Sequence, residues 1–304
     1  MMRVLLTGVT GQVGGALRAP LSKIGIVIAA DRLMLDLSSP DCINSTLASI
    51  APDLIINAAA YTAVDDAEDN RELAYCINAT APGILANWAS GHNVPMVHFS
   101  TDYVFDGSGD RPWREDDPTA PLSFYGSSKL AGEKMVRDAG GDHLIIRTSW
   151  VFASMGKNFL RTIVRIARQQ TQLRVVDDQF GAPTSARSIA ESVVLLLEGS
   201  ILPIRERFES SGGLVHLASR GDTSWHGFAS SIVKGLSDRG VDLAAEQVIP
   251  IKSNEFPTKA RRPANSRLDV SRLADLFGVT TPRWQDSLDR ELDEWVEHEW
   301  RPDA

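Results

Sequence analysis

Five short apolar segments in the first half of the chain, separated by longer stretches with helical spacing, constrain the fold most strongly. The segments are RVLLTG, GIVIAAD, DLIINAAA, PMVHFST and HLIIRTS. Nearly continuous apolar runs are typical of strands buried on both faces, and the stretches between them repeat apolar residues every three to four positions. Strands that alternate with helices form βαβ units. The sequence therefore predicts an α/β fold with a doubly wound parallel sheet.

The pattern becomes less regular after about residue 150. NFLRTIVRIARQQ and SARSIAESVVLLLEG have the spacing of amphipathic helices, and LRVVDDQ and GLVHLAS are suited to further strands. Pro-rich loops follow, and then a last helix within WQDSLDRELDEWVEHEW. We expect one domain over residues 1–150 and a smaller α/β domain over 151–304, with a possible return of about 183–200 to the first sheet.

Composition excludes several classes of function. The 304-residue chain has a net charge of −8, which argues against a nucleic-acid or anionic-membrane partner, because both need a basic surface. Two cysteines in a chain of this length favour a reduced, cytoplasmic protein. The N-terminal apolar run is too short for a signal peptide, and no apolar run approaches the length of a membrane span.

A glycine loop follows the first predicted strand and opens the first helix. In RVLLTGVTGQVGGALR, the glycines Gly8, Gly11 and Gly14 are spaced GxxGxxG. Glycines at such a turn let the backbone approach a pyrophosphate, which then binds the free N–H groups of the helix N-terminus. Asp31 ends the next predicted strand, where an acid can bind the adenosine ribose. The first domain is therefore expected to be a Rossmann-type dinucleotide-binding domain.

The sequence leaves the choice between NADH and NADPH open. Asp31 can accept hydrogen bonds from the ribose hydroxyls of NADH, whereas the neighbouring Arg32 can bind the 2′-phosphate of NADPH. An exposed Asp–Arg pair can also be merely solvated.

Tyr125 and Lys129, in the stretch PLSFYGSSKLAGEK, lie four positions apart and so share one face of a predicted helix. A nearby ammonium lowers the pKa of a tyrosine, which makes its hydroxyl a better proton donor or acceptor at neutral pH. YxxxK pairs also occur on ordinary helix surfaces. Here the pair follows HFSTDYVFDG, in which Thr101 ends a strand, where ligands bind in open α/β sheets. The combination favours a catalytic pair.

The glycine loop, the hydroxyl-bearing strand end and the YxxxK pair resemble those of the extended short-chain dehydrogenases/reductases. Further blocks are similar to those of the dTDP-4-dehydrorhamnose reductase family, in the order of that family and from near residue 1 to about 270. They are NAAAYTAVDDAE, STDYVFDG, APLSFYGSSKLAGE, RTSWVF, DDQFGAPT and ARRPANSRLD. STDYVF, RTSWVF and DQFGAPT are more specific than the glycine loop.

The resemblance implies an NADPH- or NADH-dependent enzyme. Its substrate would be a dTDP-linked 4-keto-6-deoxy sugar, dTDP-4-dehydro-L-rhamnose, reduced at C4 to dTDP-L-rhamnose. Tyr125 would protonate the oxygen at C4, Lys129 would hold the nicotinamide ribose and lower the pKa of Tyr125, and Thr101 would hydrogen-bond the sugar. The second domain would then bind the substrate.

The same matching implies further contacts to the cofactor and the substrate. The cofactor contacts would be Gly11, Gln12 and Val13 at the pyrophosphate, Asp31, Asp36 and Leu37 at the adenosine, and Ala60, Tyr61 and Thr62 further along. The substrate contacts would be Asp102 and Trp150.

Several of these residues have plainer interpretations. Trp150 can be a core aromatic, Asp102 can cap the following turn, and Asp36 can cap a helix. Arg261 and Arg262 are suited to clamping a diphosphate, because guanidinium groups match phosphate oxygens, but they can equally be solvated loop residues.

No metal site is expected. The six histidines are scattered and form no ligand motif. Some relatives are dimers bridged by a metal on carboxylates, one of them just after the glycine loop; here that turn carries Ala16 and no acid. The resemblance therefore leaves both a monomer and a homodimer open.

Two other functions share the expected fold. One is a regulatory subunit of methionine adenosyltransferase, a binding partner rather than a reductase; the intact set of Thr101, Tyr125 and Lys129 weighs against it. The other is a nucleotide-sugar 4-epimerase or 4,6-dehydratase. A dehydratase needs an acid and a base beside the catalytic hydroxyl, and Asp102 follows Thr101 directly.

Overall fold

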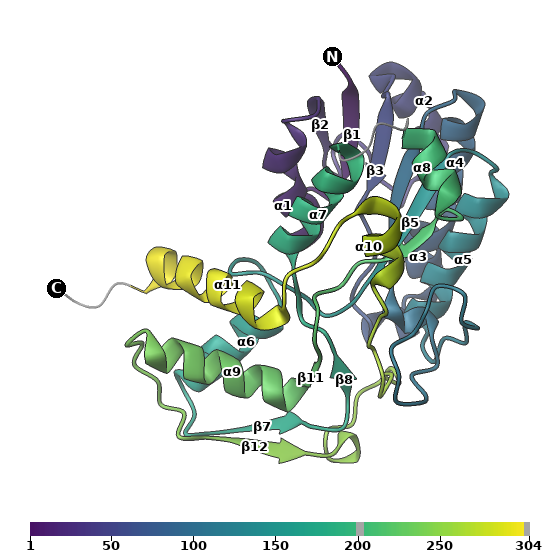
Figure 1. Cartoon of the computed structure of the whole chain (residues 1–304). Coiled ribbons are helices and arrows are strands. Elements are labelled where there is room, and N and C mark those ends of the chain that lie inside the picture. The colour runs from purple at the N-terminus through teal and green to yellow at the C-terminus, as the bar shows by residue number, and fades with distance from the viewer. Residues whose placement is uncertain (199–203, 301–304) are drawn as a thin grey trace.

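The apolar segments of the first half form a parallel sheet, as predicted. The computed structural model describes residues 1–198 and 204–300 (Figure 1). Six strands, all paired in parallel, are ordered β2-β1-β3-β4-β5-β10. They are β1 (Arg3–Thr7), β2 (Ile26–Ala30), β3 (Leu54–Asn57), β4 (Met96–Thr101), β5 (His143–Thr148) and β10 (Leu214–His216). The α/β, Rossmann-type fold class is thereby confirmed.

Helices cover both faces of this sheet (Figure 1). Side chains alternate along each strand, so that Leu6 of β1 joins the core beneath one set of helices and Leu5 joins the core beneath the other. The first set is α1 (Gln12–Leu21) and α7 (Ala186–Glu198), and the second is α2 (Pro40–Ile50), α4 (Ala81–Gly91) and α5 (Phe124–Asp138). Two dry layers explain why the strands read as continuous apolar runs.

The second half of the chain contributes to the first sheet more than expected. Within the possible return of about 183–200, α7 packs on α1, and residues 199 and 200 lie outside the described residues. The segment GLVHLAS, expected in the second domain, supplies β10 and pairs with β5. The boundary at residue 150 therefore remains a prediction, because the chain crosses between the two parts more than once.

A smaller α/β part lies beside the carboxyl ends of the sheet (Figure 1). It has its own core, formed by α6 (Phe159–Ala167), α9 (Trp225–Asp238), α11 (Trp284–Glu299) and the parallel pair β7 (Gln172–Val176) and β12 (Gln247–Ile251). Shorter elements are η1 (Asp66–Glu68), α3 (Arg71–Tyr75), η2 (Cys76–Thr80), η3 (Asp102–Val104), β6 (Val151–Phe152), β8 (Phe180–Gly181), β9 (Thr184–Ser185), α8 (Ile204–Ser210), β11 (Thr223–Ser224), η4 (Ser253–Glu255) and α10 (Ser271–Phe277).

One predicted helix is interrupted. The stretch AYCINATAPGILANWASG reads as a single helix, but η2 is a π-helical turn between α3 and α4. The π turn brings the buried amide of Asn78 to the backbone of Tyr61, from which it accepts an N–H bond of 2.8 Å and to whose carbonyl it donates one of 3.1 Å. Single π turns are often found at functional sites; this one fixes the loop after β3.

The direction of the chain reverses between β1 and β3. From β1 it proceeds outward to β2, and then returns to the other side for β3, β4 and β5. Ligands of open α/β sheets bind at such a switch point, beyond the carboxyl ends of the strands. Of the helices in the described ranges, 1–198 and 204–300, none has both the length and the apolar composition to span a membrane.

Candidate active site

A cleft of about 1190 Å³ lies at the carboxyl ends of the strands, between the sheet and the smaller part. Fifteen of the predicted site residues line it: Gly8, Gly11, Gln12, Val13, Asp31, Arg32, Asp36, Leu37, Ala60, Thr62, Thr101, Asp102, Tyr125, Lys129 and Trp150. Gly14, Tyr61 and Arg262 are not among the lining residues. The cleft extends from the glycine loop and the end of β2 to Tyr125, so one elongated ligand can contact both ends.

The glycine loop is shaped for a close backbone approach. Gly8 has φ +70°, and a Cβ there would lie 2.6 Å from the backbone of Ala58. A Cβ on Gly14 would lie 2.2 Å from the carbonyl oxygen of Gly8. The absence of a side chain at Gly14 therefore lets the first turn of α1 pack closely against the loop. Gly11 is the N-cap of α1, and no side chain caps the helix. The loop and the uncapped N–H groups therefore fit the pyrophosphate of a dinucleotide.

The outer end of the cleft is an exposed turn after β2. Asp31 Oδ1 accepts N–H bonds from Leu33 and Met34, both of 3.0 Å. Asp36 accepts from the hydroxyl of Ser38 at 2.7 Å, and this bond is the main cause that lowers the pKa of Asp36. Both carboxylates thus brace the turn. Arg32 is exposed beside them, which keeps both cofactor choices possible.

Tyr125 and Lys129 lie at the inner end, on the first turns of α5. Ser123 caps this helix by accepting the N–H of Gly126 at 3.2 Å. Only 8% of Tyr125 is exposed, and burial raises the pKa of its hydroxyl, although a hydrogen bond with Thr101 opposes the shift. The expected lowering of the Tyr125 pKa by Lys129 remains a prediction, because Lys129 is not among the causes of this shift. The hydroxyl stays protonated at neutral pH, as a proton donor to an alkoxide must be.

Lys129 is directed into the protein beneath the cleft. Its Nζ donates a 2.6 Å bond to the carbonyl oxygen of Phe99 and lies 3.4 Å from Nε2 of His98. Burial lowers the pKa of Lys129 to about 8, and Glu133, one helical turn further along α5, opposes the shift. The amine can therefore change its charge close to physiological pH.

Glu133 anchors α5 to the sheet. The carboxylate is fully buried and accepts four hydrogen bonds, of 2.6 to 2.8 Å, from the side chains of Ser100, Arg137 and, twice, Arg147. A buried carboxylate needs such compensation. Glu133 was not predicted as a site residue, although its spacing of four residues from Lys129 places it on the same helical face.

Asp102 is a buried carboxylate at the end of β4. Its Oδ1 accepts a 3.0 Å bond from the hydroxyl of Thr101, and the side chain of Ser266 lies close enough to help lower its pKa. Among the described residues, its Oδ2 forms no hydrogen bond of normal geometry. Burial raises the pKa of Asp102 to about 6. A buried oxygen without a partner beside the cleft is suited to a hydroxyl of a ligand.

Trp150 is held as a platform at the cleft. Its φ of +49° is strained for a bulky residue. Its ring stacks on Trp225 with a centroid distance of 3.5 Å, and a Cβ on Gly181 would come within 2.5 Å of the ring. Trp225 and Gly181 were not predicted as site residues. Gly181 lies in the DDQFGAPT block, but its contact joins segments distant in sequence.

The arginine loop lies at the edge of the site. Arg262 forms a 2.7 Å ion pair with Asp65, and Arg261 is exposed. The chain is held there by a second bond, from the N–H of Ala260 to Asp65 at 2.9 Å. A direct role of Arg262 at the cleft therefore remains a prediction.

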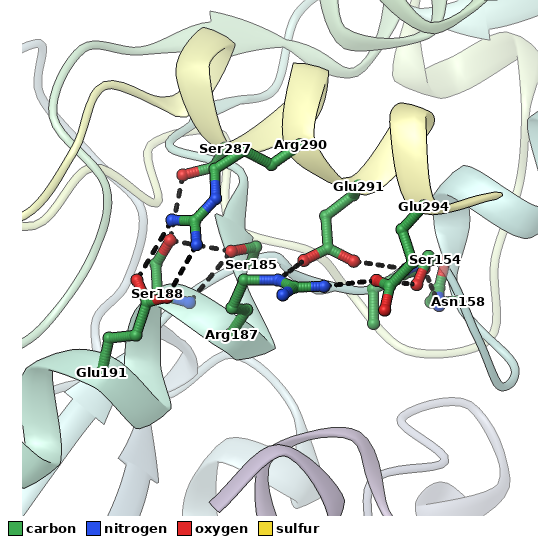
Figure 2. Close-up of polar contacts among 11 residues, drawn as sticks. Ser154, Asn158, Ser185, Arg187, Ser188, Glu191, Ser287, Arg290, Glu291 and Glu294 are labelled. Carbon is green, nitrogen blue, oxygen red and sulfur yellow. Dashed lines mark hydrogen bonds and ion pairs between the residues drawn. The ribbon is translucent and has the colours of Figure 1, made fainter. Parts of the chain in front are cut away.

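Figure 2 shows the polar contacts where α11 meets α7 and the loop after β6, a region whose side chains also line the cleft. Arg187 of α7 pairs with Glu291 and Glu294 of α11 at 3.4 and 2.5 Å. Both glutamates also accept bonds from Ser154, and Arg290 pairs with Glu191 at 2.7 Å. Within residues 1–198 and 204–300, no group of three or more His, Cys, Asp or Glu side chains is arranged to hold a metal.

Comparison with known proteins agrees with this geometry. Residues 2–296 match the family model described as "RmlD substrate binding domain". The dTDP-4-dehydrorhamnose reductase of Burkholderia thailandensis is 44% identical over 290 residues, which cover 93% of this chain and 96% of that protein.

Solved structures show the same likeness. The dTDP-4-dehydrorhamnose reductase of Clostridium acetobutylicum superposes with a TM-score of 0.87 at 35% identity, covering 96% of this chain and 99% of that one. The enzyme from Bacillus anthracis, in complex with NADP, gives 0.86 at 32% identity with the same coverage. The chain therefore belongs to the dTDP-4-dehydrorhamnose reductase family of extended short-chain dehydrogenases/reductases.

Proposed function

We propose that this protein catalyses the NAD(P)H-dependent reduction of dTDP-4-dehydro-L-rhamnose to dTDP-L-rhamnose, the final step of dTDP-L-rhamnose synthesis. The observation that carries the proposal is the position of Tyr125. Its protonated, buried hydroxyl lies with Thr101 at one end of a cleft whose other parts are a dinucleotide-binding glycine loop and turn. The full-length relationship to named reductases supports the same reaction.

Each catalytic side chain has a defined task in this reaction. The reduced nicotinamide supplies the hydride to C4 of the sugar. Tyr125 donates its proton to the oxygen at C4, which would otherwise become an unstable alkoxide. Thr101 hydrogen-bonds the sugar near that oxygen, and Lys129 holds the nicotinamide ribose. Burial of all three excludes water and strengthens these interactions.

The remaining predicted contacts divide between the two ligands. The backbone at Gly11, Gln12 and Val13 binds the pyrophosphate, and the turn with Asp31 and Arg32 receives the adenosine. NADP is bound in the relative from Bacillus anthracis, and its 2′-phosphate is the group that Arg32 would bind. Asp102 and the Trp150 platform contact the sugar, and Arg262 reaches the diphosphate after exchanging its partner Asp65.

The quaternary structure and the domain roles belong to the same proposal. The protein acts as a monomer or a homodimer in the cytoplasm, with no nucleic-acid or membrane partner. The part built around residues 1–150 binds the cofactor, and the smaller C-terminal part binds the sugar nucleotide. Size-exclusion chromatography with light scattering distinguishes the two assembly states.

A spectrophotometric assay tests the reaction. The 4-keto sugar is generated in place from dTDP-glucose by the upstream enzymes, and oxidation of NADPH and of NADH is followed separately. We expect loss of reduced cofactor with dTDP-L-rhamnose as the product. Folded protein that binds cofactor without turnover would contradict the proposal. Co-purification with methionine adenosyltransferase would then favour the regulatory subunit. Tightly retained NAD would instead favour an epimerase.

A further inference from the structure

A row of buried polar groups runs beneath the catalytic end of the cleft. It connects Thr7 at the end of β1, Asn57 at the end of β3, His98 in β4 and Lys129 in α5. The hydroxyl of Thr7 lies 2.6 Å from Asn57 Oδ1, Asn57 Nδ2 lies 3.1 Å from His98 Nδ1, and His98 Nε2 lies 3.4 Å from Lys129 Nζ. At most 2% of any of the four residues is exposed. Their donors and acceptors must therefore match one another.

The orientation of the Asn57 amide fixes the tautomer of His98. Asn57 Oδ1 accepts the hydroxyl of Thr7, and the backbone N–H of Ala59 is shared between Asn57 Oδ1 and Thr7 Oγ1, at 3.3 Å from each. The Nδ2 group, which can only donate, therefore faces His98 Nδ1. Nδ1 must accept and carries no proton. A neutral imidazole has one N–H group, so the proton of His98 is on Nε2.

This Nε2–H group faces Lys129 Nζ. An ammonium has only N–H donors, so it cannot accept this hydrogen, and two N–H groups that face each other repel. A neutral amine has a lone pair that can accept it, while one of its own N–H groups still donates to the carbonyl oxygen of Phe99. His98 in this tautomer therefore favours the neutral form of Lys129.

The surrounding charges divide in their effect on this pair. Glu133 on α5 favours the ammonium, whereas burial disfavours it. On β5, Arg147 donates hydrogen bonds to Glu133. Burial is the main cause that lowers the pKa of His98, and the charges of Lys129 and of His143, also on β5, lower it further. Tyr125 shares the face of α5 with Lys129, and Asp102 lies beyond Thr101. His98 thus stays neutral, and its effect on Lys129 is constant with pH.

We propose that His98 is a positioning residue for the reductase, which acts through Lys129 by presenting Nε2–H to Nζ in a tautomer imposed by Asn57. The inference rests on the proposed function, because it assigns its task to the lysine of that mechanism. Its consequence is that His98 adds to the effect of burial and lowers the pH above which Lys129 loses its charge, and with it the hold of the lysine on the cofactor ribose. No catalytic contact of His98 itself is involved.

The tautomer can be read directly, without turnover. In the full-length protein with ¹⁵N-labelled histidine, the ring nitrogens of His98 are assigned by their loss in His98→Gln. We expect an Nε2–H signal and an unprotonated Nδ1 from pH 6 to pH 9. An Nδ1–H ring or an imidazolium in this range would overturn the inference.

The effect on Lys129 is measured through NADPH binding. The Kd for NADPH is determined by fluorescence between pH 6 and pH 10, where loss of the ammonium weakens binding. In His98→Gln an amide oxygen can face Nζ, so we expect the rise in Kd to shift upward by about one pH unit, a tenfold change in proton affinity. His92→Gln, at an exposed histidine, is the matched control and should leave the curve unchanged.

A second variant keeps the inference testable if His98→Gln does not fold. Asn57→Asp retains acceptors for Thr7 and Ala59 and places a carboxylate opposite Nδ1, which moves the ring proton to Nδ1. We expect the changed tautomer in the NMR spectrum and the same upward shift in the binding curve. A changed tautomer with an unchanged curve would show that His98 does not act through Lys129. Wild-type protein that binds NADPH but does not reduce the sugar would instead contradict only the proposed function.

Discussion

The two ends of the cleft are built in opposite ways. At the inner end Tyr125, Lys129 and Asp102 are buried, and each has a pKa shifted away from its ordinary value. At the outer end Asp31 and Arg32 are exposed on a turn. Burial makes electrostatic interactions strong, so that a change to one buried group has a large effect, whereas solvent weakens such interactions. We therefore expect the chemistry to depend on a few fixed side chains, and cofactor choice to depend on side chains that are easily exchanged.

The largest expected effect is at the inner end. Tyr125→Phe removes only the hydroxyl, and we expect kcat to fall by about 10²–10⁴-fold, the usual contribution of a general acid. The Kd for NADPH should change little, because the ring remains packed against Tyr103. Kinetics and cofactor titration on the same preparation check both. A variant that keeps most of its rate would remove Tyr125 from the proton-donor role.

The glycine loop of the cleft should tolerate little change. Gly8→Ala adds a Cβ where φ is +70° and the backbone of Ala58 is 2.6 Å away. We expect a loss of about 1–3 kcal/mol in unfolding free energy, together with weaker NADPH binding. Gly11→Ala is the matched control, because its Cβ would meet only the Gly8 carbonyl oxygen at 3.3 Å. Denaturant unfolding that finds the two variants equally stable would contradict the comparison.

Asp102 should show that the inner end is maintained at a cost in stability. Its folded-state pKa of about 6 lies above the ordinary value, so the folded protein holds this proton at pH values where the unfolded chain has lost it. This contribution makes stability fall as the pH rises from about 4 to about 6. Asp102→Asn should remove that dependence, raise the unfolding free energy at pH 7 by about 1–2 kcal/mol and lower sugar reduction. Equal stability of both proteins at pH 7 would mean that other interactions offset the cost of burying the Asp102 carboxylate.

The smallest effect is expected at the outer end. Arg32→Gln should raise the Kd for NADPH by at most about tenfold and leave that for NADH unchanged, because an exposed charge is screened by solvent and salt. Asp31→Asn keeps an oxygen for the N–H groups of Leu33 and Met34 and should favour NADPH. Paired titrations with the two cofactors measure both changes. An effect on kcat would show that the outer end also contributes to the chemistry.

Local patterns predicted much of this molecule because the features concerned lie within short stretches. The strands of the sheet, the glycine loop, Thr101 and the Tyr125–Lys129 pair could all be identified in this way. The direction of the Tyr125 pKa shift could not be predicted in this way, because it depends on burial among distant elements. His98 and Trp225 were missed for the same reason. Only the folded sheet brings His98 next to Asn57, and only the smaller part brings Trp225 onto Trp150.

The assignment of strands to sheets had a different limit. GLVHLAS was predicted as a strand, but only three of its residues pair, and nothing in so short a segment specifies which sheet it joins. The choice is made by the open edge of β5 and by the packing of α7, α8 and α10 around it. Similarly, residues 76–80 have the composition of an α-helix but form a π turn. This turn places Asn78 where its side chain hydrogen-bonds the backbone of Tyr61.

The late position of β10 in the chain has a consequence for biosynthesis. β5 ends at Thr148, but its edge partner begins at Leu214. At a translation rate of about 5–20 residues per second, the ribosome needs roughly 3–13 seconds to supply that partner. During this interval the nascent sheet presents an unpaired apolar edge to its surroundings, and such edges recruit other strands. Slow elongation between these two strands should therefore lower the yield of native protein more than equal slowing after residue 220.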